Sequence, residues 1–392
     1  MAGTAVMRVF ADFHVHTGAA KGRPVKMAAS HQLTVAASLD WAIRVKGLHV
    51  VGLVDAVCDP VLEEIRDLCR AGHLVPVRGG GLMYQGSLLV VLGAEVEIRV
   101  SEHGAAHFGC WLPTVEAAAD FQMWLKTVQC NTGLSSQVAR TDPTRLAEEV
   151  HARNGLLVVH HAFTPFKGLL GSAADRVADI MPLEVVDAVE LGLSADADMA
   201  DRLKEMREFT FLSNSDAHSL PSIAREFNVL ALQELSFTEI QAACRRLGGR
   251  AVLMNLGLYP PLGKYYRTRC RSCGALVASK SCACGADTGL VQGVWDRIEA
   301  IADDDSPVHP PWRAPYRYIV PLSFVPGVGP RTYAKLLDAF GGEVSLLYAP
   351  PSEQALADVV GAKLAARIAA ALSGRLPVSP GGAGRYGRIE EA

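Results

Sequence analysis

The sequence has 392 residues, of which 49% are apolar and 20% are charged, and its formal net charge is −3. This length is ample for a large core with one or two further modules, and the charge excludes a protein that attracts nucleic acid over its whole surface. We find no stretch apolar enough to span a membrane and no secretory signal pattern, so we expect a cytoplasmic protein.

Residues 1–258 are expected to form the main domain. Short runs rich in β-branched residues alternate there with amphipathic stretches, which predicts an α/β fold with parallel strands. Seven runs end in or contain a histidine or a carboxylate: residues 9–11, 50–54, 88–94, 105–111, 156–159, 185–189 and 209–214. Because a parallel barrel carries its functional groups beyond the C-terminal strand ends, these side chains can converge.

The first such run leads into Asp12, His14 and His16, which alternate along one face of a strand. Imidazole and carboxylate at this spacing indicate a metal site, although a lone His-x-His pair is weak by itself. The other candidates that follow or lie within these runs are Asp55, Glu95, His107, His161, Glu190, Asp216 and His218. Carboxylates after strands can also be helix N-caps, which remains an alternative for Asp55, Glu190 and Asp216.

Four of these segments resemble motifs of the PHP (polymerase and histidinol phosphatase) superfamily: residues 12–16, 93–95, 161–165 and 213–218. Within that superfamily, residues 188–194 and 213–218 are most similar to endonuclease Q. The resemblance implies a distorted parallel β/α barrel of about seven strands that holds two or three divalent ions. It also implies an enzyme that nicks DNA on the 5′ side of deaminated bases and abasic sites.

The resemblance further implies the roles of the candidate residues. Asp12, His14, His16, Asp55, Glu95, His107, His161, Glu190, Asp216 and His218 would hold Zn²⁺, Mn²⁺ or Mg²⁺, with Glu95 bridging two ions. Asp216, His218, Glu95 and His161 would carry catalysis, and strand alternation would turn His160 away. The family commonly supplies a histidine soon after the strand that ends in Asp55, but residues 55–60 contain none. Cys58 or Asp59 would then replace it, or one metal position would be weaker or empty.

The excursion at residues 17–39 is unusually polar and basic for a connection between a strand and a helix. It contains Lys21, Arg23, Lys26 and His31. Because connections this long are more often functional than idle, we expect it to border the substrate groove, with its cations on phosphates. An ordinary solvated loop is the alternative.

Residues 259–300 are expected to form a zinc-binding module, since Cys270, Cys273, Cys282 and Cys284 provide four thiolates in two closely spaced pairs. Four cations and two tyrosines lie directly before and next to the first of these cysteines: Lys264, Tyr265, Tyr266, Arg267, Arg269 and Arg271. Cations suit phosphates and aromatic faces suit unstacked bases, so this run is a candidate DNA contact. The alternative is that the tyrosines simply pack the module against the barrel.

The C-terminal part is expected to be helical. Residues 301–316 are acidic and then proline-rich, as in a linker. In residues 317–373, Gly327 and Gly329 precede a helix that carries Arg331 and Lys335, which resembles a helix-hairpin-helix that binds DNA phosphates. Residues 374–392 are rich in Gly, Pro and Arg without periodicity, and we expect them to be disordered.

Taken together, these observations predict a metal-dependent DNA repair endonuclease. Its substrate would be duplex DNA with uracil, hypoxanthine, xanthine or an abasic site, and its products a 3′-hydroxyl and a 5′-phosphate. We expect a monomer associated with the nucleoid, with a replication sliding clamp as an open possibility for a partner. The alternatives are a small-molecule phosphoesterase of the same superfamily and a DNA-binding protein with an inactive barrel.

Overall fold

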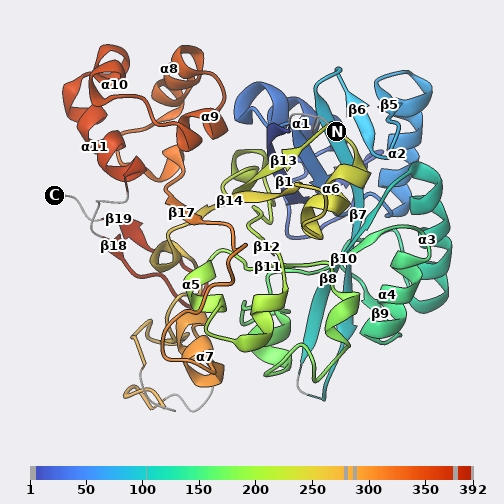
Figure 1. Ribbon diagram of the computed structural model, residues 1–392. Coiled ribbons are helices and arrows are strands. Elements are labelled where there is room, and N and C mark those ends of the chain that lie inside the picture. The colour runs from blue at the N-terminus through green and yellow to red at the C-terminus, as the bar shows by residue number, and fades with distance from the viewer. Residues whose placement is uncertain (1–5, 103, 278–280, 286–288, 374–377, 390–392) are drawn as a thin grey trace.

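A computed structural model describes residues 6–102, 104–277, 281–285, 289–373 and 378–389 (Figure 1). Its strands are β1 (Met7–Val15), β2 (Ala19–Ala20), β3 (Arg23–Pro24), β4 (Val50–Leu53), β5 (Leu74–Pro76), β6 (Leu82–Tyr84), β7 (Leu88–Arg99), β8 (Ala105–Leu112), β9 (Val138–Ala139), β10 (Leu156–Val159), β11 (Ala188–Glu190), β12 (Phe211–Leu212), β13 (Phe227–Leu232), β14 (Ala251–Leu258), β15 (Arg269–Cys270), β16 (Leu290–Val291), β17 (Tyr316–Ile319), β18 (Val378–Ser379) and β19 (Arg388–Ile389). Its helices are α1 (Val35–Trp41), α2 (Asp59–Arg70), α3 (Val115–Val128), α4 (Pro143–His151), α5 (Ala197–Ala200), α6 (Phe237–Cys244), α7 (Val294–Ile301), α8 (Pro330–Phe340), α9 (Glu343–Tyr348), α10 (Glu353–Val360) and α11 (Ala362–Leu372).

The main sheet has 13 strands within these residues, in the order β12-β11-β10-β8-β7-β4-β1-β13-β14-β17. β6 and β9 also pair with β7, and β5 pairs with β6. β1, β4 and β7 are parallel to one another, as are β10, β11 and β12, whereas β8 and β13 run antiparallel to both of their neighbours. The predicted α/β class is confirmed. The sheet exceeds about seven strands because antiparallel strands extend it.

Both faces of the sheet are covered, which is why its strands read as continuous apolar runs rather than as alternating ones. In β7, Val91 belongs to a core that also contains Phe13 and Trp111, whose rings stack with centroids 4.7 Å apart. Its neighbour Leu92 belongs to the larger core, which includes residues of α2 and α3. The strands are therefore packed on both sides.

Buried asparagines join β12, at one end of the strand order, to β13 and β14 near the other end. Asn228 of β13 accepts from the Ser213 backbone N–H at 2.9 Å and donates to the Ser213 carbonyl at 2.9 Å. Asn255 of β14 donates to the Phe211 carbonyl at 3.0 Å. A bridge between Val15 and Ala217 continues the connection to the end of β1. These contacts curl the sheet, so the segment after β12 lies beside the end of β1.

The C-terminal helices α8–α11 pack around a core of their own that includes Leu322, Leu336 and Ile368 (Figure 1). They are attached to the barrel because β17 pairs in parallel with β14. The connection between α7 and β17 has neither helix nor strand, and ion pairs hold it to the barrel. In one of them, Arg313 donates to Asp201 at 2.6 Å.

The expected disorder of residues 374–392 is wrong for the described residues 378–389, which form the hairpin β18–β19. The glycines there serve close packing rather than flexibility. The Gly381 backbone N–H donates to the Pro261 carbonyl at 2.8 Å, and the Gly387 N–H donates to the Leu262 carbonyl at 2.9 Å. A Cβ at Gly381 would lie 2.2 Å from the Gly263 carbonyl oxygen. Residues 374–377 and 390–392 lie outside the described residues.

Across the part of the chain that the structure describes, no helix has the length and apolar character required to cross a membrane.

Candidate metal centre and substrate pocket

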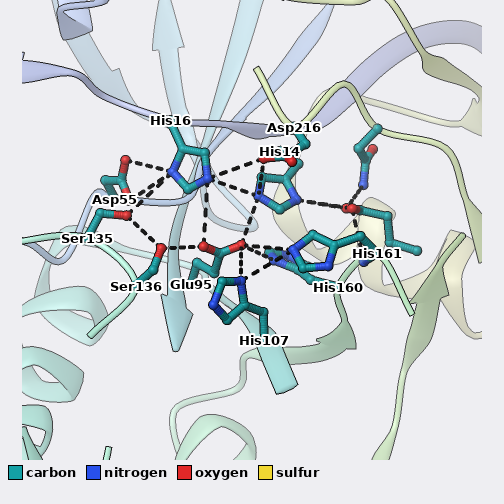
Figure 2. Close-up of polar contacts among 12 residues, drawn as sticks. His14, His16, Asp55, Glu95, His107, Ser135, Ser136, His160, His161 and Asp216 are labelled. Carbon is teal, nitrogen blue, oxygen red and sulfur yellow. Dashed lines mark hydrogen bonds and ion pairs between the residues drawn. The ribbon is translucent and has the colours of Figure 1, made fainter. Parts of the chain in front are cut away.

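Glu95 lies at the centre of a buried group of imidazoles (Figure 2). Its Oε2 is 3.2 Å from His14 Nε2, 3.2 Å from His107 Nδ1 and 3.5 Å from His161 Nε2. Its Oε1 is 3.7 Å from His16 Nε2. A single carboxylate therefore faces two sets of nitrogen atoms, His14 with His16 and His107 with His161.

Asp216 borders the first set. Its Oδ1 lies 3.4 Å from both His14 Nε2 and His16 Nε2 and, among the described residues, has no hydrogen-bond donor. His218 is adjacent, with Nδ1 3.5 Å from the same oxygen and a ring centroid 4.6 Å from that of His16. The φ of Asp216 is +46°, a left-handed conformation that departs from extended strand geometry. Asp216 and His218 consequently both face His16.

Three carboxylates each contact the ring nitrogen of a histidine that points away from Glu95. The pairs are Glu190 with His14 Nδ1 at 3.0 Å, Asp55 with His16 Nδ1 at 3.0 Å, and Glu97 with His107 Nε2 at 3.2 Å. In every pair the other ring nitrogen is the one that faces Glu95. Such a carboxylate fixes the tautomer and orientation of the ring.

Asp55, which the sequence predicted as a ligand, belongs to no potential metal-binding group among the described residues. Glu190 forms such a group with His14 and His160, so its predicted role as a ligand stays a prediction. Asp55 Oδ2 also accepts the Thr17 backbone N–H at 2.7 Å. Glu190 also accepts from Asn214 Nδ2 at 2.8 Å and from the His161 backbone N–H at 3.1 Å. Glu97 was missed as a functional residue. Its position two residues after Glu95, on the same face of a strand, was the available signal.

Asp12, which the sequence also predicted as a ligand, belongs to no potential metal-binding group among the described residues. Its Oδ1 accepts the Ser215 backbone N–H at 3.0 Å, and its Oδ2 accepts the Ala224 N–H at 2.8 Å. Burial raises the pKa of this carboxyl although those hydrogen bonds oppose the shift. Asp12 thus anchors the loop that carries Asp216.

His160 is turned toward the centre together with His161, so the prediction from strand alternation is wrong here. β10 ends at Val159, and His161 has a φ of +27°, so the alternating geometry of the strand does not continue through the pair. His160 Nδ1 lies 3.4 Å from Glu95 Oε2, and its ring centroid is 4.0 Å from that of His14. Its buried Nε2 has no hydrogen-bond partner among the described residues.

Neither residue that could have replaced the missing histidine enters the centre. Asp59 faces outward, where it pairs with Lys126 at 2.8 Å and accepts from Thr132 at 2.8 Å. Cys58 is buried at the start of α2, and burial raises the pKa of its thiol well above the usual range. Neither residue belongs to a potential metal-binding group among the described residues.

The donor set fits divalent ions. His14 Nε2 and His16 Nε2 lie only 3.4 Å apart and converge on the same carboxylates, an arrangement that a shared cation stabilises. Burial disfavours charge on His14, yet Glu190 and Asp216 raise its pKa well above the usual range. Despite its own burial, Glu95 has a pKa well below the usual range because of His107, Lys26 and His16. The space among these side chains therefore favours positive charge.

A cavity of about 510 Å³ opens beside the centre. Asp216, His218 and His161 line it on one side, and Arg225, Lys264 and Tyr265 contribute cations and an aromatic ring. Tyr386 of the C-terminal hairpin completes this wall. It is hydrogen-bonded to Arg225, and its ring centroid lies 4.8 Å from Lys264 Nζ. Sequence reasoning missed Arg225 and Tyr386, because no local pattern links them to the barrel motifs.

The four cysteines converge as expected. Cys270 Sγ lies 3.7 Å from Cys284 Sγ, and Cys273 Sγ lies 3.4 Å from Cys282 Sγ. All four sulfur atoms lie within 4.8 Å of one another, which suits a tetrahedral metal site.

The basic aromatic run before the cysteines does not form one continuous track. Lys264 and Tyr265 line the cavity beside the metal centre, and their contact with DNA stays a prediction. Tyr266 instead lies against Trp295 of α7, with ring centroids 6.1 Å apart, and Arg267 pairs with Asp296 of α7 at 2.9 Å. Tyr266 and Arg267 therefore contact α7.

The later cations of the run lie outside the cavity. Arg269 donates to the Pro380 carbonyl at 2.9 Å and so holds the C-terminal hairpin. Arg271 is exposed, and its guanidinium lies 5.4 Å from the Phe166 ring centroid. Arg271 therefore keeps its donors available to a ligand.

The predicted glycine turn before α8 is present. Gly327 has a φ of +96°, and no atom lies within 4 Å of a Cβ built on Gly329, so another backbone can approach it closely. Arg331 and Lys335 are exposed beside the turn. A second open turn at Gly361, with φ +82°, separates α10 from α11 and was not predicted.

No family model matches this sequence. The chain is 38% identical over 389 residues to the uncharacterized protein YqxK of Bacillus subtilis, an alignment that covers 98% of this chain and 99% of that protein. It is 29% identical to the lesion-specific endonuclease PfuEndoQ of Pyrococcus furiosus, whose crystal structure superposes with a TM-score of 0.83 over 98% of this chain and 95% of that one.

A structure of endonuclease Q with a 27-mer duplex substrate, which has an abasic lesion at the active site, gives a TM-score of 0.85. Its identity is also 29%, over 98% of this chain and 97% of that one. The chain belongs to the family of YqxK. The two endonuclease Q structures share its fold over almost their whole length, which agrees with the resemblance of its motifs to that branch of the PHP superfamily.

Proposed function

We propose that this protein is a metal-dependent DNA repair endonuclease. It hydrolyses the phosphodiester on the 5′ side of a deaminated base or an abasic site and leaves a 3′-hydroxyl and a 5′-phosphate. The observation that carries the proposal is the set of imidazoles around Glu95, which opens onto a cavity lined by Arg225, Lys264 and Tyr265. The likeness to an endonuclease Q complex with lesion-containing duplex DNA supports the same substrate class.

Two ions would be held through Glu95. His14, His16, Glu95 and Asp216 would hold the first, and Glu95, His107 and His161 the second. Such ions supply hydroxide near neutral pH and neutralise phosphoryl oxygens. The imidazole of His218 is neutral at neutral pH because burial lowers its pKa to about 4, so it can accept a proton or ligate. We assign catalysis to Asp216, His218, Glu95 and His161, and structural Zn²⁺ to the four cysteines.

The cavity supports DNA rather than a small phosphomonoester as the substrate. Three of its wall residues, Lys264, Tyr265 and Tyr386, come from beyond the barrel, so the appended modules take part in the site. A damaged base would have to leave the helical stack to be read there, at a cost of a few kcal/mol that is least for mispaired bases. The exposed Arg331 and Lys335 would contact phosphates further along the duplex.

The test incubates the protein with duplexes that each carry one uracil, hypoxanthine, xanthine or abasic site, with Mn²⁺, Mg²⁺ or Zn²⁺ added in turn. We expect nicking at the lesion by the parent protein and no nicking by Asp216→Asn. The exposed Asp179→Asn is the matched control and should cleave normally. Equal cutting of undamaged duplex would refute lesion specificity, and normal cutting by Asp216→Asn would refute the metal centre as the catalytic site.

The product ends distinguish hydrolysis from other modes of strand scission. A nick with a 3′-hydroxyl and a 5′-phosphate is sealed by DNA ligase without prior processing, so we expect direct ligation to restore the strand. We further propose that the active enzyme is a monomer. Sedimentation of the active enzyme on DNA measures the number of protein chains in the complex.

A further inference from the structure

The metal centre contains a lysine, Lys26, to which the proposed function assigns no role. Lys26 Nζ lies 3.0 Å from Glu95 Oε1 and 2.5 Å from Ser136 Oγ, and the side chain is only 15% exposed. Ser136 is itself hydrogen-bonded to the same carboxylate oxygen. The ammonium therefore lies on the Oε1 side of Glu95, whereas His107 and His161 lie on the Oε2 side.

The backbone directs Lys26 into the centre. The Lys26 N–H donates to the Thr17 carbonyl at 3.1 Å, and its own carbonyl accepts from Ala29 at 3.0 Å. The neighbouring Val25 carbonyl accepts from Ser135 at 3.0 Å. These contacts tie the segment to the end of β1 and to the loop that contains Ser136, so the position of Lys26 is fixed by the fold.

The other paired cations of the same excursion point elsewhere. Lys21 is paired with Asp67, and Arg23 pairs with Glu63 at 3.0 Å, both on the surface of α2. They are the solvated loop cations of the alternative interpretation. Lys26 differs from them because its charge lies against buried carboxylates rather than exposed ones.

Lys26 lies on the side of the centre where the sequence lacks the histidine that the family commonly supplies after the strand ending in Asp55. The loop after β4 offers no imidazole beyond Asp55, and Cys58 and Asp59 stay out of the centre. Asp55 and Asp216 are the next carboxylates whose charge acts on Lys26. His16, Asp216 and His218 also form a potential metal-binding group, but it shares His16 with the group around Glu95. The side of the centre that lacks a further histidine after Asp55 thus already contains a fixed positive charge.

We propose that the barrel holds two divalent ions and that the Lys26 ammonium supplies, in place of a third ion, the positive charge between Glu95, Asp55 and Asp216. This inference rests on the proposed function for the role of the centre, but not for the number of ions. An ammonium carries one charge and three N–H donors on a covalent tether. Unlike a third ion, it cannot be removed by a chelator.

The first test counts ions in the full-length protein after saturation with Mn²⁺ or Zn²⁺ and removal of excess metal, by mass spectrometry of the metals. We expect three ions per chain, two in the barrel and one on the cysteines, and two in a Cys270→Ser/Cys282→Ser variant. A third barrel ion in either protein overturns the proposal. The count needs no DNA, so it remains decisive even if no lesion is ever cut.

The second test removes the positive charge of Lys26 by substitution. Lys26→Met should keep two barrel ions yet lose about 10²- to 10³-fold in kcat on the best lesion duplex, as expected for loss of a preorganised charge. Lys26→Arg should recover part of that loss. Lys21→Met, the same change in the same excursion, should match the parent. Full activity of Lys26→Met would overturn the proposal, and so would an activity loss explained by loss of ions.

Discussion

Glu190 contacts His14 at the ring nitrogen that points away from Glu95. Burial opposes its charge, but His14 and His160 lower its pKa to about 2, so it is a carboxylate at any working pH. It contacts His14 Nδ1 and accepts hydrogen bonds from Asn214 and the His161 backbone. Glu190 thereby couples the orientation of two histidines from different strands.

We expect Glu190→Gln to weaken binding of the barrel metals about 10- to 100-fold, because the neutral amide no longer fixes the His14 ring in its charged environment. Competition against a fluorescent chelator measures the affinity, and the melting temperature reports whether the fold is intact. Glu184→Gln, at an exposed position, is the control. An unchanged affinity would mean that Glu190 has no orienting role.

Glu226 is a buried carboxyl outside the centre. Its Oε1 accepts the Leu258 N–H at 2.7 Å, and its Oε2 has no partner among the described residues. Burial raises its pKa well above the usual range, so the folded protein keeps the group neutral. Its stabilising contribution is complete below the ordinary carboxyl pKa and is lost as the pH rises toward the folded value.

Accordingly, Glu226→Gln should match the parent in stability at acidic pH and become the more stable protein as the pH rises. The difference in the free energy of unfolding between the two proteins should grow by up to about 1.4 kcal/mol per pH unit, until the pH reaches the pKa of Glu226 in the folded protein. Unfolding by urea across pH 5 to 9 measures it. The exposed Glu234→Gln should show no such slope, and a parallel pair of curves for Glu226→Gln would contradict the neutral state.

At the scale of elements, the hairpin β18–β19 contributes to the substrate cavity. It hydrogen-bonds to residues 261 and 262, and its Tyr386 contacts Arg225, Lys264 and Phe324. The two cations that face the cavity are thus held by a segment that reaches them from the far end of the chain. The hairpin is an integral part of the cavity wall.

Tyr386→Ala should raise KM for a lesion duplex about 5- to 30-fold, since a hydrogen bond and a cation–π contact together contribute about 1–2 kcal/mol. Tyr386→Phe keeps the ring and should lie between the two proteins. Steady-state cleavage separates KM from kcat, and the exposed Ser379→Ala is a control on the same hairpin. A KM equal to that of the parent would assign Tyr386 to packing alone.

For the whole molecule, one buried ion pair joins the barrel to the C-terminal helices. Lys46 Nζ lies 2.5 Å from Glu343 Oε2 and donates to the Pro221 carbonyl at 2.8 Å. Glu343 also accepts from Tyr333 at 2.7 Å and from the Leu322 N–H at 3.1 Å. Every charge at this junction is therefore compensated.

Breaking the pair on one side leaves a buried charge, so Lys46→Met should destabilise the protein by about 3–5 kcal/mol. Lys46→Met/Glu343→Leu should recover part of that loss. Denaturant unfolding followed by fluorescence measures both. Arg145→Met, in an exposed pair with Glu148, should cost less than about 1 kcal/mol. Equal effects of the buried and exposed substitutions would show that the junction adds nothing to stability.

The sequence by itself determined the chemical identity of the centre. His14 and His16 alternate along a strand, Glu95 ends a buried run, and His161 and Asp216 stand in recognisable motifs. Strand periodicity and side-chain chemistry are local properties, so they can be read without coordinates. The α/β class and the gathering of the four cysteines follow from the same kind of local pattern, and the structure bears both out.

Only the tertiary structure decided which carboxylates face the space among the imidazoles and which contact the outer ring nitrogens of the histidines. That distinction depends on local φ values and on backbone N–H groups far along the chain, as for Asp12 with Ser215 and Ala224. It also brought Lys26 to Glu95 across 69 positions and Tyr386 to Arg225 across 161. Contacts between such distant residues follow from chain closure and packing, which no local pattern of residues records.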